Sequence, residues 1–204
     1  AKDLPGTPVA ADIAGAARPI VHVAAARLPL RWNRLVVLLV ACGVLSHGLY
    51  RHRWIAFPEV HGDSRTADAQ HHLRQSTHYT CGPAACAAAL SYCGVVISER
   101  DMAALCLTRA QGSSLFDLYR GVVLGLGDRG YRVSIEDLDV DALLAGDHLV
   151  VASNAGLGHA LCIAVRGGVV DVHDPLQPEV QHWSRAELQK QYRPPAIVIR
   201  HLAA

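Results

Sequence analysis

The sequence predicts an α+β protein in which a helical half precedes an antiparallel sheet. Three segments between residues 81 and 126 are predicted helices, because they combine helix-forming or apolar-periodic residues with start and stop signals. From residue 131 onward, short apolar or alternating segments are separated by turns, and Gly167-Gly168 is typical of a hairpin. Helices that precede the strands, rather than alternate with them, are typical of α+β proteins.

The composition limits the size of the folded part and excludes several functions. A chain of 204 residues has room for one domain of about 150 residues plus an appendage. The net charge is +1, without a basic patch or a charge block, so we expect no nucleic-acid partner. Six cysteines are too few for a disulfide scaffold, and the chain has no CxxC pair of the kind that binds structural zinc. We therefore expect neither a metal nor a cofactor.

The first 56 residues predict a membrane attachment. Residues 1–33 are rich in Ala, Pro and Arg and predict an irregular lead-in. Residues 34–56 are predicted to form a transmembrane or signal-anchor helix, because residues 35–50 carry no charge and are flanked by arginines and aromatic residues. This run is short for a span. Three alternatives therefore stay open: a signal-peptide region, a lipoprotein box at residues 39–42 with Cys42 lipidated, and a buried helix.

The arginines on the two sides of the uncharged run are nearly balanced, with a slight excess on the N-terminal side. The positive-inside rule then favours a cytoplasmic N-terminus. We therefore expect a single-pass membrane protein that contacts the membrane through residues 35–50. Its folded domain is expected to lie outside the cytoplasm.

Residues 57–74 predict a linker that leads into a domain over residues 75–204. Their composition changes to His, Arg, Asp, Ser and Gln, with few aliphatic residues. Four histidines stand out in this part of the chain: His61, His71, His72 and His78. Since no i, i+4 pair of them is accompanied by a carboxylate, we interpret them as solvated surface rather than as metal ligands.

The elements of the domain follow from local signals. Helices are predicted to begin at Cys81, at the capping-box-like Ser98-Glu-Arg-Asp101 and at Ser114. Two shorter helices are predicted at residues 140–144 and from Ser184. The predicted strands cover residues 131–135, 148–153, 159–165, 169–173 and 196–200.

Cys81 is the candidate nucleophile. It ends a polar, turn-prone run and begins an Ala-rich helix with Pro83 in its first turn. The unpaired N–H groups and the dipole of a helix N-terminus favour a thiolate. Cys86 and Cys93 recur on one helical face, so we interpret them as core residues. Gln75 lies six residues before Cys81, and its side-chain amide could donate to a developing oxyanion.

His159 and Asp174 are the candidate partners of this thiolate. A cysteine hydrolase needs an imidazole beside the thiolate and a third group that orients the imidazole. If Gly167-Gly168 form a two-residue turn, residue 159 lies opposite about residue 176. The Asp174 carboxylate can then reach the ring nitrogen of His159 that does not face sulfur. His173 points to the other side of its strand, so we do not choose it as the base.

Together, these residues resemble the C39 peptidases, the papain-like double-glycine leader peptidases. The resemblance covers about residues 70–202 and rests on Gln75-x5-Cys81-Gly-Pro-Ala, Gly112-Ser-Ser-Leu115, Gly158-His159-Ala and Asp174-Pro175. It implies a papain-like fold, with N-terminal helices packed on an antiparallel sheet. It also implies a catalytic role for four residues: Cys81 as nucleophile, His159 as general base and acid, Asp174 as its orienting partner, and Gln75 in the oxyanion hole.

The activity that this resemblance implies is the cleavage of a peptide or protein substrate, such as a leader sequence, after Gly-Gly. Family members fused to exporters often have an Asp before the cysteine and also carry an ATPase. This chain has Thr80 at that position and no Walker A motif. It therefore resembles the stand-alone, membrane-anchored type.

Two other functions stay open at this point. A C39-like domain could bind peptides without cleaving them, as an assembly subunit of a membrane-protein complex. The same triad could also support another acyl transfer, such as transglutaminase-like or amidase chemistry. Selective labelling of Cys81 by a thiol probe would favour an enzyme, and product analysis would separate proteolysis from other acyl transfers.

Overall fold

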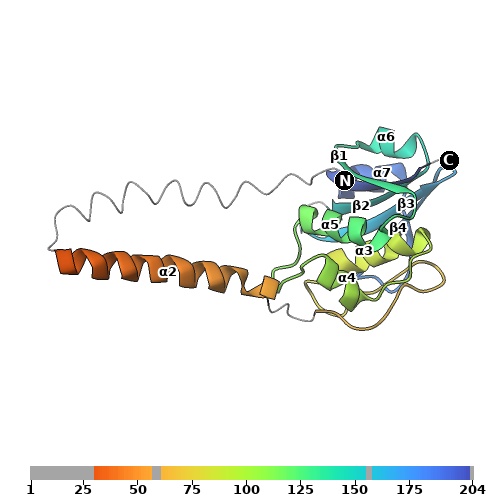
Figure 1. Cartoon of the computed structure of the whole chain (residues 1–204). Helices are drawn as coiled ribbons and strands as arrows, with labels where there is room; N and C mark the ends of the chain where they lie inside the picture. The colour runs from red at the N-terminus through yellow and green to blue at the C-terminus, as the bar shows by residue number, and fades with distance from the viewer. Residues whose placement is uncertain (1–29, 57–60, 155–157, 203–204) are drawn as a thin grey trace. The chain divides into compact units, whose positions relative to one another are not determined.

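A computed structural model describes residues 30–56, 61–154 and 158–202 (Figure 1). The chain divides into two compact units, residues 1–53 and residues 54–204, and each is described by itself. Most of the predicted lead-in, and residues 57–60 of the predicted linker, lie outside the described residues.

The helix predicted over residues 34–56 is present as α2 (Leu30–Ala56). However, none of the helices in the described ranges is long and apolar enough to cross a membrane. The physical reason lies in the uncharged run at residues 35–50. At 1.5 Å per residue its 16 residues extend about 24 Å, whereas a bilayer core is about 30 Å thick.

Three helices form the first half of the second unit: α3 (Cys81–Tyr92), α4 (Glu99–Leu105) and α5 (Leu115–Leu126). Ser98 caps α4, and Ser114 forms a capping box with Asp117 at the start of α5. Every residue of α3 from Gly82 to Leu90 is buried. The small alanine side chains let the neighbouring elements approach this helix closely.

The second half is a six-stranded antiparallel sheet in the order β1-β6-β2-β3-β4-β5. Its strands are β1 (Tyr131–Glu136), β2 (His148–Asn154), β3 (Ala160–Arg166), β4 (Val169–His173), β5 (Gln181–His182) and β6 (Tyr192–His201). Two short helices, α6 (Val140–Leu144) and α7 (Arg185–Gln191), lie between strands in the sequence. Strand β6 is longer than predicted because it pairs with both β1 and β2.

Apolar cores lie on both faces of the sheet. Residues of α3, α4 and α5 pack with one set of strand residues, which includes Val151 and Ile197. Leu143 of α6 and Leu188 of α7 belong to the other core, with Val150 and its neighbours. Val150 and Val151 point to opposite faces, as alternate residues of a strand do. Figure 1 shows α3–α5 on one side of the sheet and α6 and α7 on the other, so the predicted packing of the helices on the sheet is confirmed.

The predicted hairpin register is confirmed. Arg166 pairs with Val169 across Gly167-Gly168, and Cys162 pairs with His173. Strand β3 begins one residue later than predicted, so His159 is the last residue before it. The register therefore brings residues 159 and 174 to the same end of the two strands.

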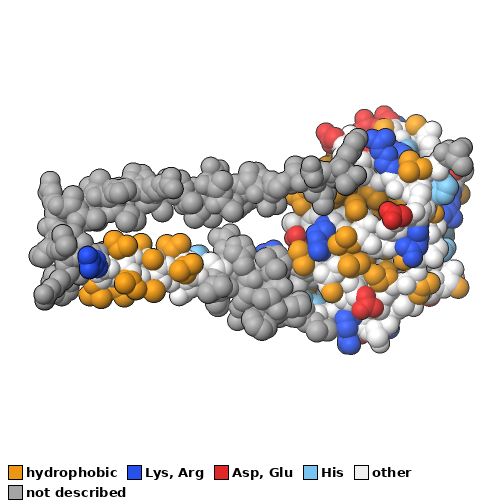
Figure 2. Space-filling model, viewed as in Figure 1, with side chains coloured by type: hydrophobic (Ala, Val, Ile, Leu, Met, Phe, Trp, Pro, Cys, Tyr) orange, Lys and Arg blue, Asp and Glu red, His pale blue; other side chains and the backbone are white. Residues whose placement is uncertain are grey.

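The segment before α3 is more buried than the sequence interpretation proposed. His61 and His72 are buried rather than solvated. His72 Nε2 donates to the Gln177 carbonyl at 3.0 Å, and Thr66 forms a β-bridge with Ser98. This segment is buried because it packs between α4 and the turn after β4. On the visible face of the folded unit, positive and negative side chains are interspersed, in agreement with the composition (Figure 2).

Candidate active site

The candidate nucleophile Cys81 is the first residue of α3. The N-cap residue, Thr80, makes no side-chain cap, because its hydroxyl donates back to the Thr77 carbonyl at 3.1 Å. Pro83 in the first turn has no N–H to satisfy. The first N–H groups of the helix are therefore left for the site, where they and the dipole favour negative charge.

His159 and Asp174 meet as the register predicts. His159 Nε2 lies 2.6 Å from Asp174 Oδ1, and both side chains are about one-tenth exposed. Asp174 Oδ1 also accepts from the Leu176 N–H at 2.9 Å, which orients the carboxylate. Since Nε2 contacts Asp174, Nδ1 is the ring nitrogen of His159 that is available to the Cys81 thiol.

The electrostatics favour a charged pair. Burial raises the pKa of the Cys81 thiol, but hydrogen bonds from His159 and the Ala160 N–H outweigh it and bring that pKa below its usual value. Burial likewise lowers the pKa of His159, but its hydrogen bonds to Asp174 and Cys81 raise that pKa to about 9. Burial raises the pKa of Asp174, and its hydrogen bonds from His159 and Leu176 lower it below the usual value. These shifts move the Cys81–His159 pair toward a thiolate beside an imidazolium.

Gln75 lies beside the turn that carries Asp174, because its backbone N–H donates to the Pro175 carbonyl at 3.1 Å. Its side-chain Nε2 donates to the Thr77 carbonyl at 2.6 Å, while Oε1 is buried without a hydrogen-bond partner in the described part of the chain. The amide is thus held by the loop that leads to Cys81 rather than by Cys81 itself. One of its two N–H groups remains free to donate.

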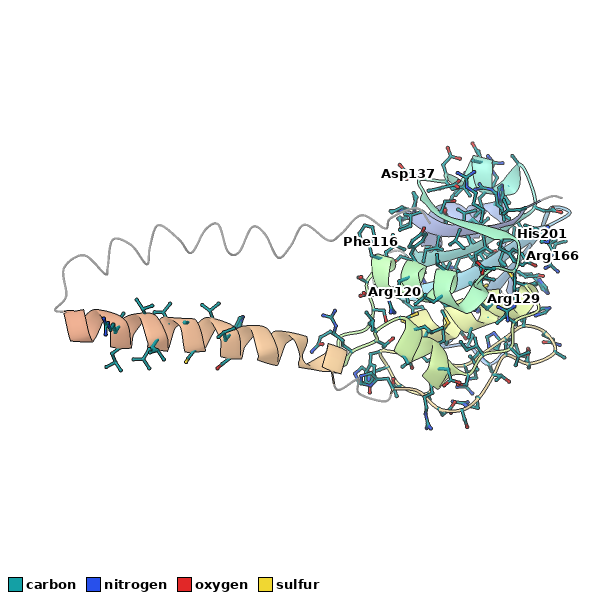
Figure 3. The ribbon with its side chains drawn as sticks, in the orientation of Figure 1. Phe116, Arg120, Arg129, Asp137, Arg166 and His201 are labelled. Atoms are coloured by element: carbon teal, nitrogen blue, oxygen red, sulfur yellow. The ribbon has the colours of Figure 1, made fainter. Side chains whose placement is uncertain are left out.

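A cleft of about 440 Å³ opens at Cys81. The sheet side of its lining includes Ser153, Gly158 and Ala160, and the helical side includes Gly82 and residues 110–113 with Leu115 and Leu118. Leu118 packs so closely on Gly82 that a Cβ there would lie 2.6 Å from Leu118 Cδ2. Figure 3 labels Phe116 and Arg120, which mark α5, the helix that contributes this wall.

Sequence reasoning missed several parts of this site. Thr80 and Thr77 hold the loop before the nucleophile, the Ala160 N–H donates to the thiol, and Ser153 lines the cleft. Gly112-Ser-Ser-Leu115 was part of the family resemblance, but its position in the cleft wall was not predicted. No sequence signal marks the others, because their roles depend on which segments pack together.

The fold is that of double-glycine peptidase domains. The peptidase domain of Streptococcus ComA, a bifunctional ABC transporter of a quorum-sensing pathway, aligns with a TM-score of 0.50 and 20% identity, over 65% of this chain and 97% of that one. A double-glycine-motif protease of an AMS/PCAT transporter, solved with its leader peptide, aligns with a TM-score of 0.51 and 12% identity, over 69% and 93%.

Comparisons of the sequence itself add less. No family model matches the chain. An uncharacterised protein of Methanothermobacter marburgensis is 40% identical over 67 residues, which are 32% of this chain and 47% of that protein. The chain therefore spans about half the length of the curated relative that it matches.

Proposed function

We propose that this protein is a cysteine peptidase in which Cys81 is the nucleophile, His159 the general base and acid, and Asp174 the group that orients His159. The observation that carries this proposal is the 2.6 Å contact between His159 Nε2 and Asp174 Oδ1, next to a Cys81 thiol whose pKa His159 lowers. The thiol lies at a helix N-terminus that opens into a cleft. This is the arrangement that a thiol nucleophile requires.

The proposed reaction has two steps. The Cys81 thiolate attacks the substrate carbonyl, and the free N–H of Gln75 and the Cys81 N–H stabilise the oxyanion. His159 donates its proton to the leaving amine, which breaks the peptide bond and leaves an acyl-enzyme. His159 then takes a proton from water, the resulting hydroxide attacks the thioester, and the thiol is released with the carboxylic acid product.

The likeness to the solved double-glycine protease supports a proposal for the substrate class. That protease was solved in complex with its leader peptide. We propose that this protein likewise acts on a peptide or leader sequence, with small residues such as Gly-Gly before the scissile bond. The membrane complex and the location outside the cytoplasm stay predictions.

The direct test compares Cys81→Ala with Cys93→Ala. Cys93 also belongs to the end of α3, but burial raises the pKa of its thiol and it lies away from the His159–Asp174 pair. With a peptide that contains a Gly-Gly site, Cys81→Ala should abolish hydrolysis and Cys93→Ala should retain it. Iodoacetamide should label Cys81 rapidly and the other thiols slowly.

Two outcomes would contradict the proposal. Hydrolysis that persists in Cys81→Ala would exclude the thiol as nucleophile. Uniform, slow labelling of all thiols, together with intact peptide binding and no cleavage, would indicate a peptide-binding subunit.

A further inference from the structure

Glu99, the first residue of α4, is a fully buried carboxyl group outside the proposed triad. Its two oxygens accept from two backbone N–H groups that lie far apart in the sequence. Oε1 accepts from Ser76 at 2.8 Å, and Oε2 accepts from Asp63 at 3.0 Å. One side chain of the helical half therefore fastens the segment before α3 at both of its ends.

The surroundings of Glu99 are shaped for this contact. The Glu99 N–H donates to the Arg65 carbonyl and the Arg100 N–H to the Asp63 carbonyl, both at 2.9 Å. Gly62 has a φ of +81°, and a Cβ at that position would lie 2.9 Å from Glu99 Cγ. Only glycine suits this backbone, so the chain passes directly over the carboxyl group.

The hydrogen bond between Ser76 and Glu99 lies next to Gln75, the proposed oxyanion donor. Ser76 is the residue after Gln75, so the 2.8 Å hydrogen bond from its N–H sets the position of the adjoining peptide unit. The backbone N–H of Gln75 itself donates to the carbonyl of Pro175, the residue after Asp174. Gln75 is thus held between Glu99 and the turn that carries the orienting carboxylate.

A buried carboxyl group is a costly way to hold a loop. Burying a polar side chain costs free energy unless its polar atoms are hydrogen-bonded, and both Glu99 oxygens accept hydrogen bonds. The capping carboxylate of Glu187 binds the Ser184 N–H at the surface without this cost. The cost of burying Glu99 is explained if catalysis depends on the exact position of the loop that carries Gln75 and Ser76.

We propose that Glu99 is a positioning residue of the peptidase: by holding the Ser76 N–H it fixes the Gln75 amide where the oxyanion develops. The inference depends on the proposed function. Displacement of a donor by about 1 Å is expected to slow catalysis by up to about a hundredfold.

The test is Glu99→Gln, which keeps the size of the side chain. An amide has only one oxygen, so it can accept from only one of the two N–H groups and presents its own NH₂ to the other. We expect kcat to fall about tenfold to a hundredfold with little change in KM, because the contact acts on the transition state. The rate of Cys81 alkylation should stay the same, because alkylation needs no oxyanion hole.

Two further measurements separate positioning from a general loss of structure. In a Gln75→Ala background, Glu99→Gln should lower kcat by less than about twofold, because the group it positions is already gone. Glu187→Gln, which removes the exposed capping carboxylate of α7, should leave kcat unchanged. Equal losses in both backgrounds, or a parallel fall in the alkylation rate, would overturn the inference.

Hydrogen exchange in the unaltered protein tests the same contact if Glu99→Gln does not fold. The side chain of Ser76 is exposed, but its N–H should exchange slowly because it donates to a buried carboxyl group. Fast exchange of this N–H would overturn the inference. If the unaltered protein cleaves no peptide, the proposed function fails and this inference fails with it; if it cleaves and Glu99→Gln matches it, only the role of Glu99 is wrong.

Discussion

The start of α3 and the body of the same helix place a thiol in opposite surroundings. At Cys81, burial raises the pKa, but hydrogen bonds from His159 and the Ala160 N–H bring it below the usual value. At Cys86, five residues further on, burial raises the pKa far above the usual value, and the neighbouring Cys106 raises it further. The difference shows that hydrogen-bond donors at the helix end, not the residue type or the helix, lower the pKa of a thiol.

Two buried histidines at the ends of β3 and β4 repeat this contrast. Burial lowers the pKa of both rings. At His159 the hydrogen bond to Asp174 outweighs burial and raises the pKa to about 9. At His173, burial and the nearby His72 lower it to about 4, and Nε2 lies 2.8 Å from the Tyr92 hydroxyl. The pKa shifts therefore favour the charged forms of Cys81 and His159 at the start of α3, and the neutral forms of Cys86 and His173 along its body.

The largest expected effect contrasts these two histidines. His159→Ala should lower kcat/KM by about a thousandfold or more, because it removes the proposed general acid and base. His173→Ala should keep kcat/KM within about threefold. It should instead lower the free energy of unfolding by about 1–3 kcal/mol, because the buried imidazole is removed and the partly buried Tyr92 hydroxyl loses its partner. Kinetics and urea unfolding of both variants provide the measurement, and equal kinetic losses would contradict the contrast.

A smaller effect should come from the two aspartates that contact histidines near the end of the sheet. Asp174→Asn leaves the shape intact but removes the charge beside His159, so kcat should fall by about a hundredfold or more. Asp171→Asn is the matched control, because Asp171 pairs with the exposed His182 at 2.8 Å, on the sheet edge. Single-turnover kinetics should show no change for it. A loss as large as that of Asp174→Asn would mean that the triad is wrongly assigned.

The pH dependence should show the charged pair. His159 has a folded-state pKa of about 9, above its ordinary 6.5, so its contribution to stability is complete below about pH 6.5 and is lost as the pH rises through about 9. The basic limb of the kcat/KM profile should lie near pH 9, where His159 loses the proton needed by the leaving amine. Unfolding and hydrolysis measured from pH 5 to about 10 check both statements. A basic limb near pH 6.5 would show that Asp174 does not raise this pKa.

The smallest effect concerns the body of α3. Cys86→Ala removes one buried sulfur and should lower the free energy of unfolding by about 1 kcal/mol. The alkylation rate of Cys81 and the hydrolysis rate should not change. If Cys86→Ala slowed alkylation of Cys81 tenfold, the two regions of the helix would not be independent.

Part of the site geometry could be predicted because it depends on local signals. The Cys-Gly-Pro sequence places Cys81 at the start of a helix, and Gly167-Gly168 set the register that brings His159 to Asp174. Both features involve neighbours in the sequence, or strands joined by a two-residue turn. The catalytic roles of these residues and of Gln75 stay predictions until the variants are measured.

Other features could not be predicted because they depend on segments that are far apart in the chain. The composition of residues 61–74 suggested a solvated linker, but His61 and His72 are buried.

The sequence alone determined the order of the helices and of every strand except β5, the hairpin register and the place of Cys81 at a helix start, because each follows from the backbone preferences of adjacent residues. Only the tertiary structure decided which segments form the walls of the cleft, and that Glu99 holds the loop of Gln75. Those arrangements depend on side chains meeting across the fold, and no local preference encodes such meetings.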